Sequence, residues 1–451
     1  MAWGSEVESA NRVMVDANTY PEEFNVEQTL YFSGRTDGVF DHDARTWSGS
    51  PGELFVGRVA LPKPRTVPRT SIGKFQENNR SSRVGVVKRL IHPGEVNRIR
   101  AFPLAPHMIA THTDSPTVFI WNTVTQPNRL ENLSDDTKVI DKDNKSSMGA
   151  STNTTSSSTS TTGGGRKKSG SWIDPCRCSV PDLELVGHKQ LAEYALDTKG
   201  DSKVLSGGSD KLVLLWSLQD GANEKNQVQP RMVFEGHTAP VEDCSFRPNN
   251  AGEDRCCSVG QDRFLLLWDA RSPKYSERCP DTHSADANCC AWNVNDLILT
   301  GGSDCVVNVF DIRKLDLPLT YVEQKSSIIN VRWSPDDPHV FAVTDEAANL
   351  TLYKLDAGGV RKADVFFQHL GHRTSVVDLQ FNPSQPWTMA SVSDDSADEA
   401  RGGGGTLQIW RVNEFVHRTM QDKEWVNDVL SKTATGVSPP GNTSEEESSE
   451  E

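Results

Sequence analysis

The segment SVGQDRFLLLWDAR at residues 258–271 decides the fold. It places a turn containing Asp262 before an aliphatic run that closes at Trp268 and Asp269. The same arrangement occurs in SGGSDKLVLLW at 206–216 and in TGGSDCVVNVFDIR at 300–313. In each copy an aspartate stands six residues before the closing aromatic residue: Asp210 and Trp216, Asp262 and Trp268, Asp304 and Phe310. Short aliphatic runs between Gly, Asp and Ser turns indicate strands, so the copies predict a repeated β unit.

A histidine opens each copy, and the openings set the period of the repeat. His188, His237 and His283 stand 49 and 46 residues apart, close to the roughly 40–45 residues of a WD repeat. Looser copies open at His92, at Gln324-Lys325 and at Gly371-His372, and they close at Trp121, Tyr353 and Trp410. Residues 29–34 and 52–61 supply strands for an N-terminal unit. We therefore predict an all-β, seven-bladed WD-repeat β-propeller over residues 1–412.

The repeated His, Asp and Trp residues are expected to be structural. An aspartate in a tight turn can accept hydrogen bonds from turn amides and from the histidine of its repeat, and the Trp can join the same buried network. Such a network stabilises a blade, and several blades must stack to bury a core.

Three segments are not expected to form blades. Residues 142–171 contain almost no apolar side chains and predict a disordered loop within the propeller. Its Arg166, Lys167 and Lys168 are either a nuclear-import signal or three solvated charges. An apolar pattern predicts a short C-terminal helix over 413–432. The acidic tail at 433–451 is expected to be disordered.

Composition favours a binding protein over an enzyme. The 451 residues carry a formal charge of −15, which favours basic partners and argues against direct nucleic-acid binding. The nine cysteines lack zinc-site spacing and are expected to be reduced core residues, while no apolar run reaches the ~18 residues of a membrane span. No phosphate-binding loop, HExxH or GxSxG motif occurs, so we expect no catalytic residue, metal or cofactor.

The residues that follow the repeat openings predict a peptide-binding face. Propeller loops from every blade converge around the central channel. Acidic and polar residues recur there, and together they would attract a Lys- or Arg-rich peptide. The set includes Glu95, Asn97, Arg98, Glu193, Tyr194, Glu242, Asp286, Asn288, Asp394 and Asp395.

Several longer motifs carry a family resemblance. IHPGEVNRIR (91–100), ATHTDSP (110–116), TQPNR (125–129), GHTAPVEDCSF (236–246), WDAR (268–271) and PWTMASVSDD (386–395) together resemble the MSI family of retinoblastoma-associated histone-binding WD proteins. GGGGTLQIW (402–410) and FFQHLGHR (366–373) are most similar to its plant-type FVE branch. The resemblance implies a nuclear histone chaperone and transcription regulator, shared among chromatin-assembly, histone deacetylase and Polycomb-type complexes.

The resemblance also implies a site for a histone tail. Its positions correspond here to Glu95, Asn97, Arg98, Tyr194, Glu242, Asn288 and Asp394. In the fifth opening, where the family has an acidic and an aromatic residue, this chain has Ser327 and Ile329.

A second implied surface is a groove for a core-histone helix, with Phe366, Phe367, Phe415 and Val416 at matching positions. The chain starts at Met1, which aligns with the strand after the family's N-terminal helix, so the helix covering this groove is expected to be absent. The four residues are then expected to form an exposed apolar patch. Residues 2–9 are expected to complete the last blade as its outer strand, beside residues 405–412.

The WDAR ending leaves a second function class open. It resembles the motif by which WD proteins dock on the adaptor of cullin ubiquitin ligases, with Asp269 and Arg271 as the contacts. The alternative is that the same residues form only a turn at the end of a strand.

Overall fold

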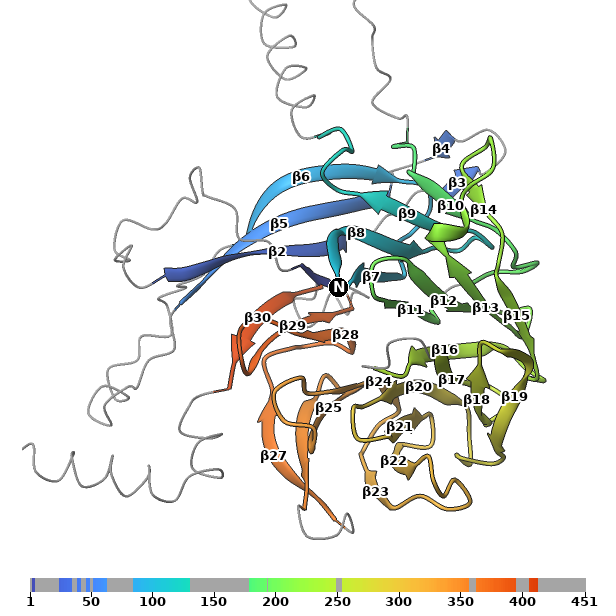
Figure 1. Ribbon diagram of the computed structural model, residues 1–451. Helices are drawn as coiled ribbons and strands as arrows, with labels where there is room; N and C mark the ends of the chain where they lie inside the picture. Colours follow the sequence, from blue (N-terminus) through green and yellow to red (C-terminus); the bar gives the residue numbers. More distant parts are fainter. Residues whose placement is uncertain are drawn as a thin grey trace, which may run out of the picture.

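Seven β-sheets surround a central axis in the computed structural model of this chain (Figure 1). It describes residues 2–4, 24–34, 39–41, 46–48, 52–62, 84–129, 178–192, 194–248, 254–356, 362–394 and 405–412. The predicted seven-bladed WD-repeat propeller is confirmed. The expected loop at 142–171, the helix at 413–432 and the tail at 433–451 lie outside the described residues.

The first three blades contain the N-terminal half of the strands. Blade 1 orders β1 (Ala2–Gly4), β2 (Phe24–Gly34), β5 (Gly52–Pro62) and β6 (Val84–His92), with a separate hairpin of β3 (Val39–Asp41) and β4 (Thr46–Ser48). Blade 2 comprises β7 (Arg98–Phe102), β8 (Ala105–His112), β9 (Val118–Asn122), β10 (Leu183–Leu185) and β14 (Gln227–Val228). Blade 3 comprises β11 (Leu196–Lys199), β12 (Lys203–Gly207), β13 (Leu212–Ser217) and β15 (Met232–Glu235), with the 3-10 turn η2 (Leu218–Asp220) after β13.

In the remaining four blades, strands that follow one another along the chain pair antiparallel. Blade 4 comprises β16 (Val241–Phe246), β17 (Arg255–Gly260), β18 (Leu265–Asp269) and β19 (Ser272–Cys279). Blade 5 comprises β20 (Ala287–Trp292), β21 (Leu297–Gly302), β22 (Val306–Asp311) and β23 (Thr320–Glu323). Blade 6 comprises β24 (Ile328–Trp333), β25 (Val340–Asp345), β26 (Leu350–Leu355) and β27 (Ala363–His369), and the described part of blade 7 comprises β28 (Val376–Phe381), β29 (Thr388–Ser393) and β30 (Leu407–Arg411).

The predicted network of His, Asp and Trp residues forms completely in blade 4, whereas in blade 3 His188 pairs with Asp210 but Trp216 donates to the carbonyl oxygen of Val186. In blade 4, His237 Nδ1 lies 2.9 Å from a carboxylate oxygen of Asp262, and His237 Nε2 lies 2.7 Å from Ser258 Oγ. Trp268 Nε1 donates to the same Ser258 hydroxyl at 2.8 Å. The network ties the opening loop to the turn between the second and third strands and to the buried Trp.

Apolar clusters between neighbouring sheets form the core. Cys256 packs with residues of blade 3, whereas its neighbour Cys257 packs with residues of blade 5. The two thiols therefore lie on opposite faces of β17, as alternation along a strand requires. Burial raises the pKa of Cys256 well above its usual value, which keeps this thiol protonated.

The expected closure of the ring by residues 2–9 is wrong in its strand pairing. β1 pairs antiparallel with β2, with Trp3 opposite Leu30, and it is the innermost strand of blade 1. It also contacts β7 and β28, the inner strands of the neighbouring blades. Without β1 the inner edge of β2 would present unpaired backbone groups to the channel, so this position satisfies hydrogen bonds that an outer position would leave open.

The inner strands of the blades run in the same direction around the axis. Asn288 at the start of β20 donates to the carbonyl oxygen of Ile328 at the start of β24, at 2.8 Å. Near the ends of the same two strands, Trp333 Nε1 donates to the carbonyl oxygen of Ala291 at 3.0 Å. The ring therefore has an entry face, where β7, β11, β16, β20, β24 and β28 begin, and an exit face, where they end.

Candidate functional site

The loops on the entry face are held by a backbone hydrogen bond that repeats from blade to blade. In each case an amide in the turn after the second strand donates to a carbonyl oxygen of the opening loop. The pairs are Gln261 to Pro240 at 3.0 Å, Ser303 to Asp286 at 2.9 Å, Glu346 to Ser327 at 3.1 Å and Asp394 to Ser375 at 2.9 Å. In these four blades the opening loop and the turn after the second strand are therefore held together at the entry face.

The residues predicted to bind a tail lie at this end of the inner strands, but their environments differ. Glu95 is exposed, and Tyr194 exposes 46% of its surface. Glu242 is half-buried and accepts a hydrogen bond from Gln261 Nε2 at 2.8 Å. Asn97 and Asp394 are also half-buried. A ligand on the entry face can reach charged groups from several blades. Glu193 and Asp395 lie outside the described residues.

Asn288 has a role within the fold that its place in the sequence did not show. Its amide nitrogen bridges to Ile328 in the next blade, and its side-chain oxygen accepts from Ser303 Oγ at 3.1 Å. These contacts use both polar atoms of the Asn288 side chain. We therefore assign to Asn288 the positioning of the loop that carries Asp286.

Arg98 points into the channel and is only 8% exposed. Its Nη1 lies 3.8 Å from Oδ1 of Asp243, which is fully buried on β16. Burial alone would lower the pKa of Arg98, but the charges of Asp243 and Asp378 outweigh it and raise the pKa. Arg98 therefore contributes to the channel, below the surface that a peptide would contact.

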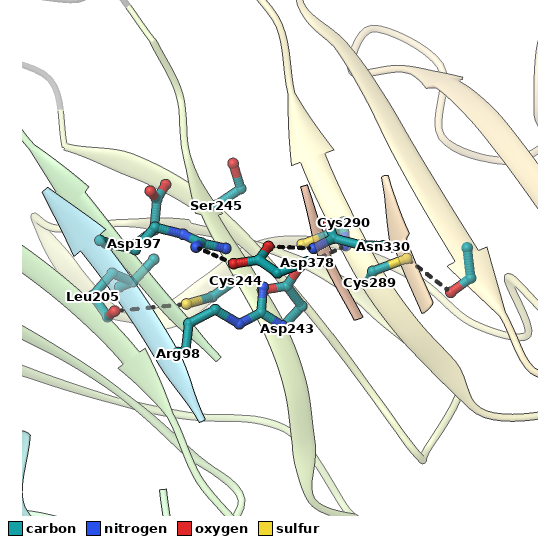
Figure 2. A network of polar contacts seen from close by, with 12 residues as sticks. Arg98, Asp197, Leu205, Asp243, Cys244, Ser245, Cys289, Cys290, Asn330 and Asp378 are labelled. Atoms are coloured by element: carbon teal, nitrogen blue, oxygen red, sulfur yellow. Dashed lines mark hydrogen bonds and ion pairs between the residues drawn. The ribbon is translucent and has the colours of Figure 1, made fainter. Parts of the chain in front are cut away.

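Polar groups from several inner strands meet in the channel, where Arg98, Asp243, Asn330 and Asp378 converge (Figure 2). Asn330 Nδ2 donates to Asp378 Oδ1 at 2.9 Å, and Arg100 Nη1 lies 3.4 Å from Asp378 Oδ2. Burial would raise the pKa of Asp378, but nearby positive charges, including Arg100 and Arg98, hold it well below its usual value. The carboxylate therefore stays ionised and links blades 2, 6 and 7.

Glu346 is an acidic residue of the entry face that the sequence analysis missed. It lies in the turn after β25, is exposed, and donates its amide to the carbonyl oxygen of Ser327. It thus supplies a carboxylate in the blade whose opening has Ser327 and Ile329. Its position in the repeat could have identified it, because Glu346 directly follows the second strand of blade 6, as Asp394 follows the second strand of blade 7.

The phenylalanines assigned to a helix groove are not an exposed patch. Phe366 is only 8% exposed, and its ring lies 5.4 Å from that of Trp387. Phe367 is half-buried and stacks on Trp410 at 5.8 Å. Both pack between blades 6 and 7, because the outer part of β27 faces the last blade. Phe415 and Val416 lie outside the described residues.

Asp269 and Arg271 form a local turn after β18. The Arg271 amide and Nε donate to Asp269 Oδ1 at 3.0 and 2.8 Å, and Arg271 Nη2 pairs with the other carboxylate oxygen. The hydrogen bonds from Arg271 lower the pKa of Asp269 to about 2. Asp311 accepts from the Arg313 amide in the same way in blade 5. These hydrogen bonds explain Asp269 and Arg271 as parts of a turn at the end of a strand. Docking on a ligase adaptor through the same two residues stays a prediction, which a pulldown with the adaptor, with and without Arg271→Ala, can test.

Within the described ranges no cluster of three His, Cys, Asp or Glu side chains could hold a metal ion. In the same residues no helix is long and apolar enough to cross a membrane.

Comparison with known proteins agrees with this architecture. The family model described as WD domain, G-beta repeat matches residues 228–269 and 276–311. WD-40 repeat-containing protein MSI4 of Arabidopsis thaliana is 37% identical over 460 residues, which cover 93% of this chain and 78% of the relative. The chain belongs to the MSI family. A second MSI protein, WD-40 repeat-containing protein MSI3 of Arabidopsis thaliana, is 25% identical over 83% of this chain and 78% of the relative.

Proposed function

We propose that this MSI-family chain is a histone-binding scaffold that takes a basic histone tail on its entry face. The observation that carries the proposal is the presence of carboxylates from five blades on this one face. They are Glu95, Glu242, Asp286, Glu346 and Asp394. Charges of one sign around a channel mouth attract a ligand of the opposite sign and set its orientation.

Tyr194 adds a second kind of contact to the proposed site. Its side chain is 46% exposed in the opening loop before β11, so it can pack against the aliphatic part of a Lys or Arg side chain or against its charged head. Exposed Lys189 and Arg373 directly follow the opening histidines His188 and His372, while exposed Lys325 stands in an opening that has no histidine. A basic peptide is therefore expected to bind near the channel mouth.

Membership of the MSI family supports a proposal for the role in the cell. We propose that the chain acts in the nucleus as a non-catalytic subunit shared by histone deacetylase, Polycomb-type and chromatin-assembly complexes. Its net charge of −15 suits core histones and disfavours direct contact with DNA.

The test is a charge reversal at two blades. Glu95→Lys combined with Glu242→Lys should weaken a Lys- and Arg-rich histone-tail peptide at least about fivefold, which corresponds to about 1 kcal/mol. Isothermal titration calorimetry at low and high salt measures this change. The loss should be greatest at low salt, because salt screens exposed charges.

Glu277→Lys is the matched control, because Glu277 is exposed on β19, the outer strand of blade 4. It changes the net charge by the same amount per residue without altering the entry face. Unchanged peptide affinity in the double variant, or an equal loss in Glu277→Lys, would refute the proposed site.

A further inference from the structure

A polar cavity of about 170 Å³ lies at the exit face of the channel. Its lining comes from the ends of β7, β11, β24 and β28, and includes Arg100, Asp197, Thr198, Arg332 and Gln380. The volume is far above the roughly 10–15 Å³ that suffices for one water.

Two guanidinium groups in this cavity have donors without partners. Arg100 is 6% exposed, and its Nη2 has no hydrogen-bond partner among the described residues. The same holds for Nε of Arg332. A buried donor without an acceptor costs about 1–3 kcal/mol, and more when it is charged, so both groups would gain from an acceptor in the cavity.

The only carboxylate that lines the cavity in the described residues is already committed to the backbone. Asp197 Oδ2 accepts from the Phe246 amide at 2.7 Å, and Oδ1 accepts from its neighbour's amide at 2.9 Å. The Asp378 carboxylate, which does not line the cavity, accepts hydrogen bonds from Arg100 and Asn330. The lining thus contains two arginines and one carboxylate, and the second carboxylate, Asp378, which pairs with Arg100, lies outside the lining.

The electrostatics agree with this geometry. Burial, followed by the charge of Arg332, lowers the pKa of Arg100 to about 10. Like charges held this close in a buried place destabilise one another, and an anion placed between them would relieve the repulsion.

We propose that this cavity binds the phosphate group of a small molecule, with Arg100 and Arg332 as its ligands. A guanidinium suits a phosphate because its planar fork presents several N–H groups to oxygen atoms. Gln380 and Thr198, whose hydroxyl donates to the carbonyl oxygen of Ala101 at 2.8 Å, complete the polar lining. The cavity is small and lies at the opposite end of the channel from the proposed tail site, so the two sites are independent.

The test measures binding of inorganic phosphate to the full chain. Calorimetry and thermal unfolding should show a saturable response to phosphate that chloride at equal ionic strength does not produce. Arg332→Gln should reduce the affinity at least tenfold, while Arg231→Gln at an exposed arginine should leave it unchanged. Arg332→Lys should recover only part of the affinity, because it retains the charge and loses the fork.

A second variant guards against a simple loss of folding. Gln380→Glu places a carboxylate in the cavity, where it should take the place of the anion. We expect it to raise the melting temperature without phosphate and to abolish the response to phosphate. No saturable response in the wild-type chain, or an unchanged response in both Arg332→Gln and Gln380→Glu, would overturn the proposal.

Discussion

Single side chains at the blade turns hold the entry face together. Asp262 accepts from His237, from the Thr238 amide at 2.7 Å and from the Phe264 amide at 3.2 Å. Burial would raise the pKa of Asp262, but these hydrogen bonds and the interaction with His237 lower it. An ionised carboxylate with several donors is therefore the anchor of the loop that leads to Glu242.

Asp262→Ala should reduce the free energy of unfolding by about 2–4 kcal/mol, because it leaves a buried histidine nitrogen and two amides without their acceptor. Urea denaturation measures the loss. Asp316→Ala, at an exposed aspartate, is the control and should change stability little. Equal stability of the two variants would show that the carboxylate is not an anchor.

His92 predicts a pH dependence of stability. Burial lowers its pKa from 6.5 to about 3, although its hydrogen bond to the Gly94 carbonyl opposes the shift. Below about pH 6.5 the unfolded chain gains a proton at this residue that the folded chain does not, so stability falls as pH drops towards about 3, by up to about 1.4 kcal/mol per unit.

His92→Gln should therefore reduce the loss of unfolding free energy between about pH 7 and about pH 5 by about 2 kcal/mol. Denaturant titration at both pH values gives the difference. The same pH slope in His92→Gln and in wild type would contradict the assignment.

At this scale the sequence predicted which residues repeat but not where their side chains point. Arg98 and Asn288 follow repeat openings just as Glu95 and Glu242 do. Arg98 nevertheless faces Asp243 in the channel, and Asn288 bridges to Ile328. The direction of each side chain depends on residues of other blades. The sequence of one repeat does not show which residues of other blades lie next to it.

For the strands, too, one part of the sequence prediction is correct and another part is wrong. Residues 29–34 and 52–61 were predicted to form strands of an N-terminal blade, and they lie within β2 and β5 of blade 1. The pairing of β1 was not predicted correctly, because residues 2–4 could complete either of two open sheet edges. The structure places them at the channel, where β1 contacts β7 and β28.

Deleting residues 1–4 tests this arrangement. Loss of β1 should expose the inner edge of β2 and remove the contacts of β1 with β7 and β28, so the melting temperature should fall by several degrees and aggregation should increase. Deleting residues 448–451 is a control of equal length at the other terminus. A melting temperature unchanged by the first deletion would show that β1 does not stabilise the ring.

At the scale of the whole molecule, charge is sorted along the axis. Carboxylates surround the channel mouth on the entry face, paired charges fill the channel, and two arginines with open donors lie at the exit face. The repeat explains this distribution of charge, because equivalent positions of successive blades lie at the same level along the channel axis. Composition indicated a basic partner, whereas only the assembled ring shows that Glu346 joins the same face.

Hydrogen–deuterium exchange with and without a Lys- and Arg-rich histone-tail peptide tests the central claim most directly. We expect protection to be confined to loops before the inner strands and to turns after the second strands, including the amides of Val96, Glu242 and Asp286. The protection should weaken as salt is raised. Protection on the outer strands β19, β23 and β27 instead, with the entry-face loops unchanged, would contradict it.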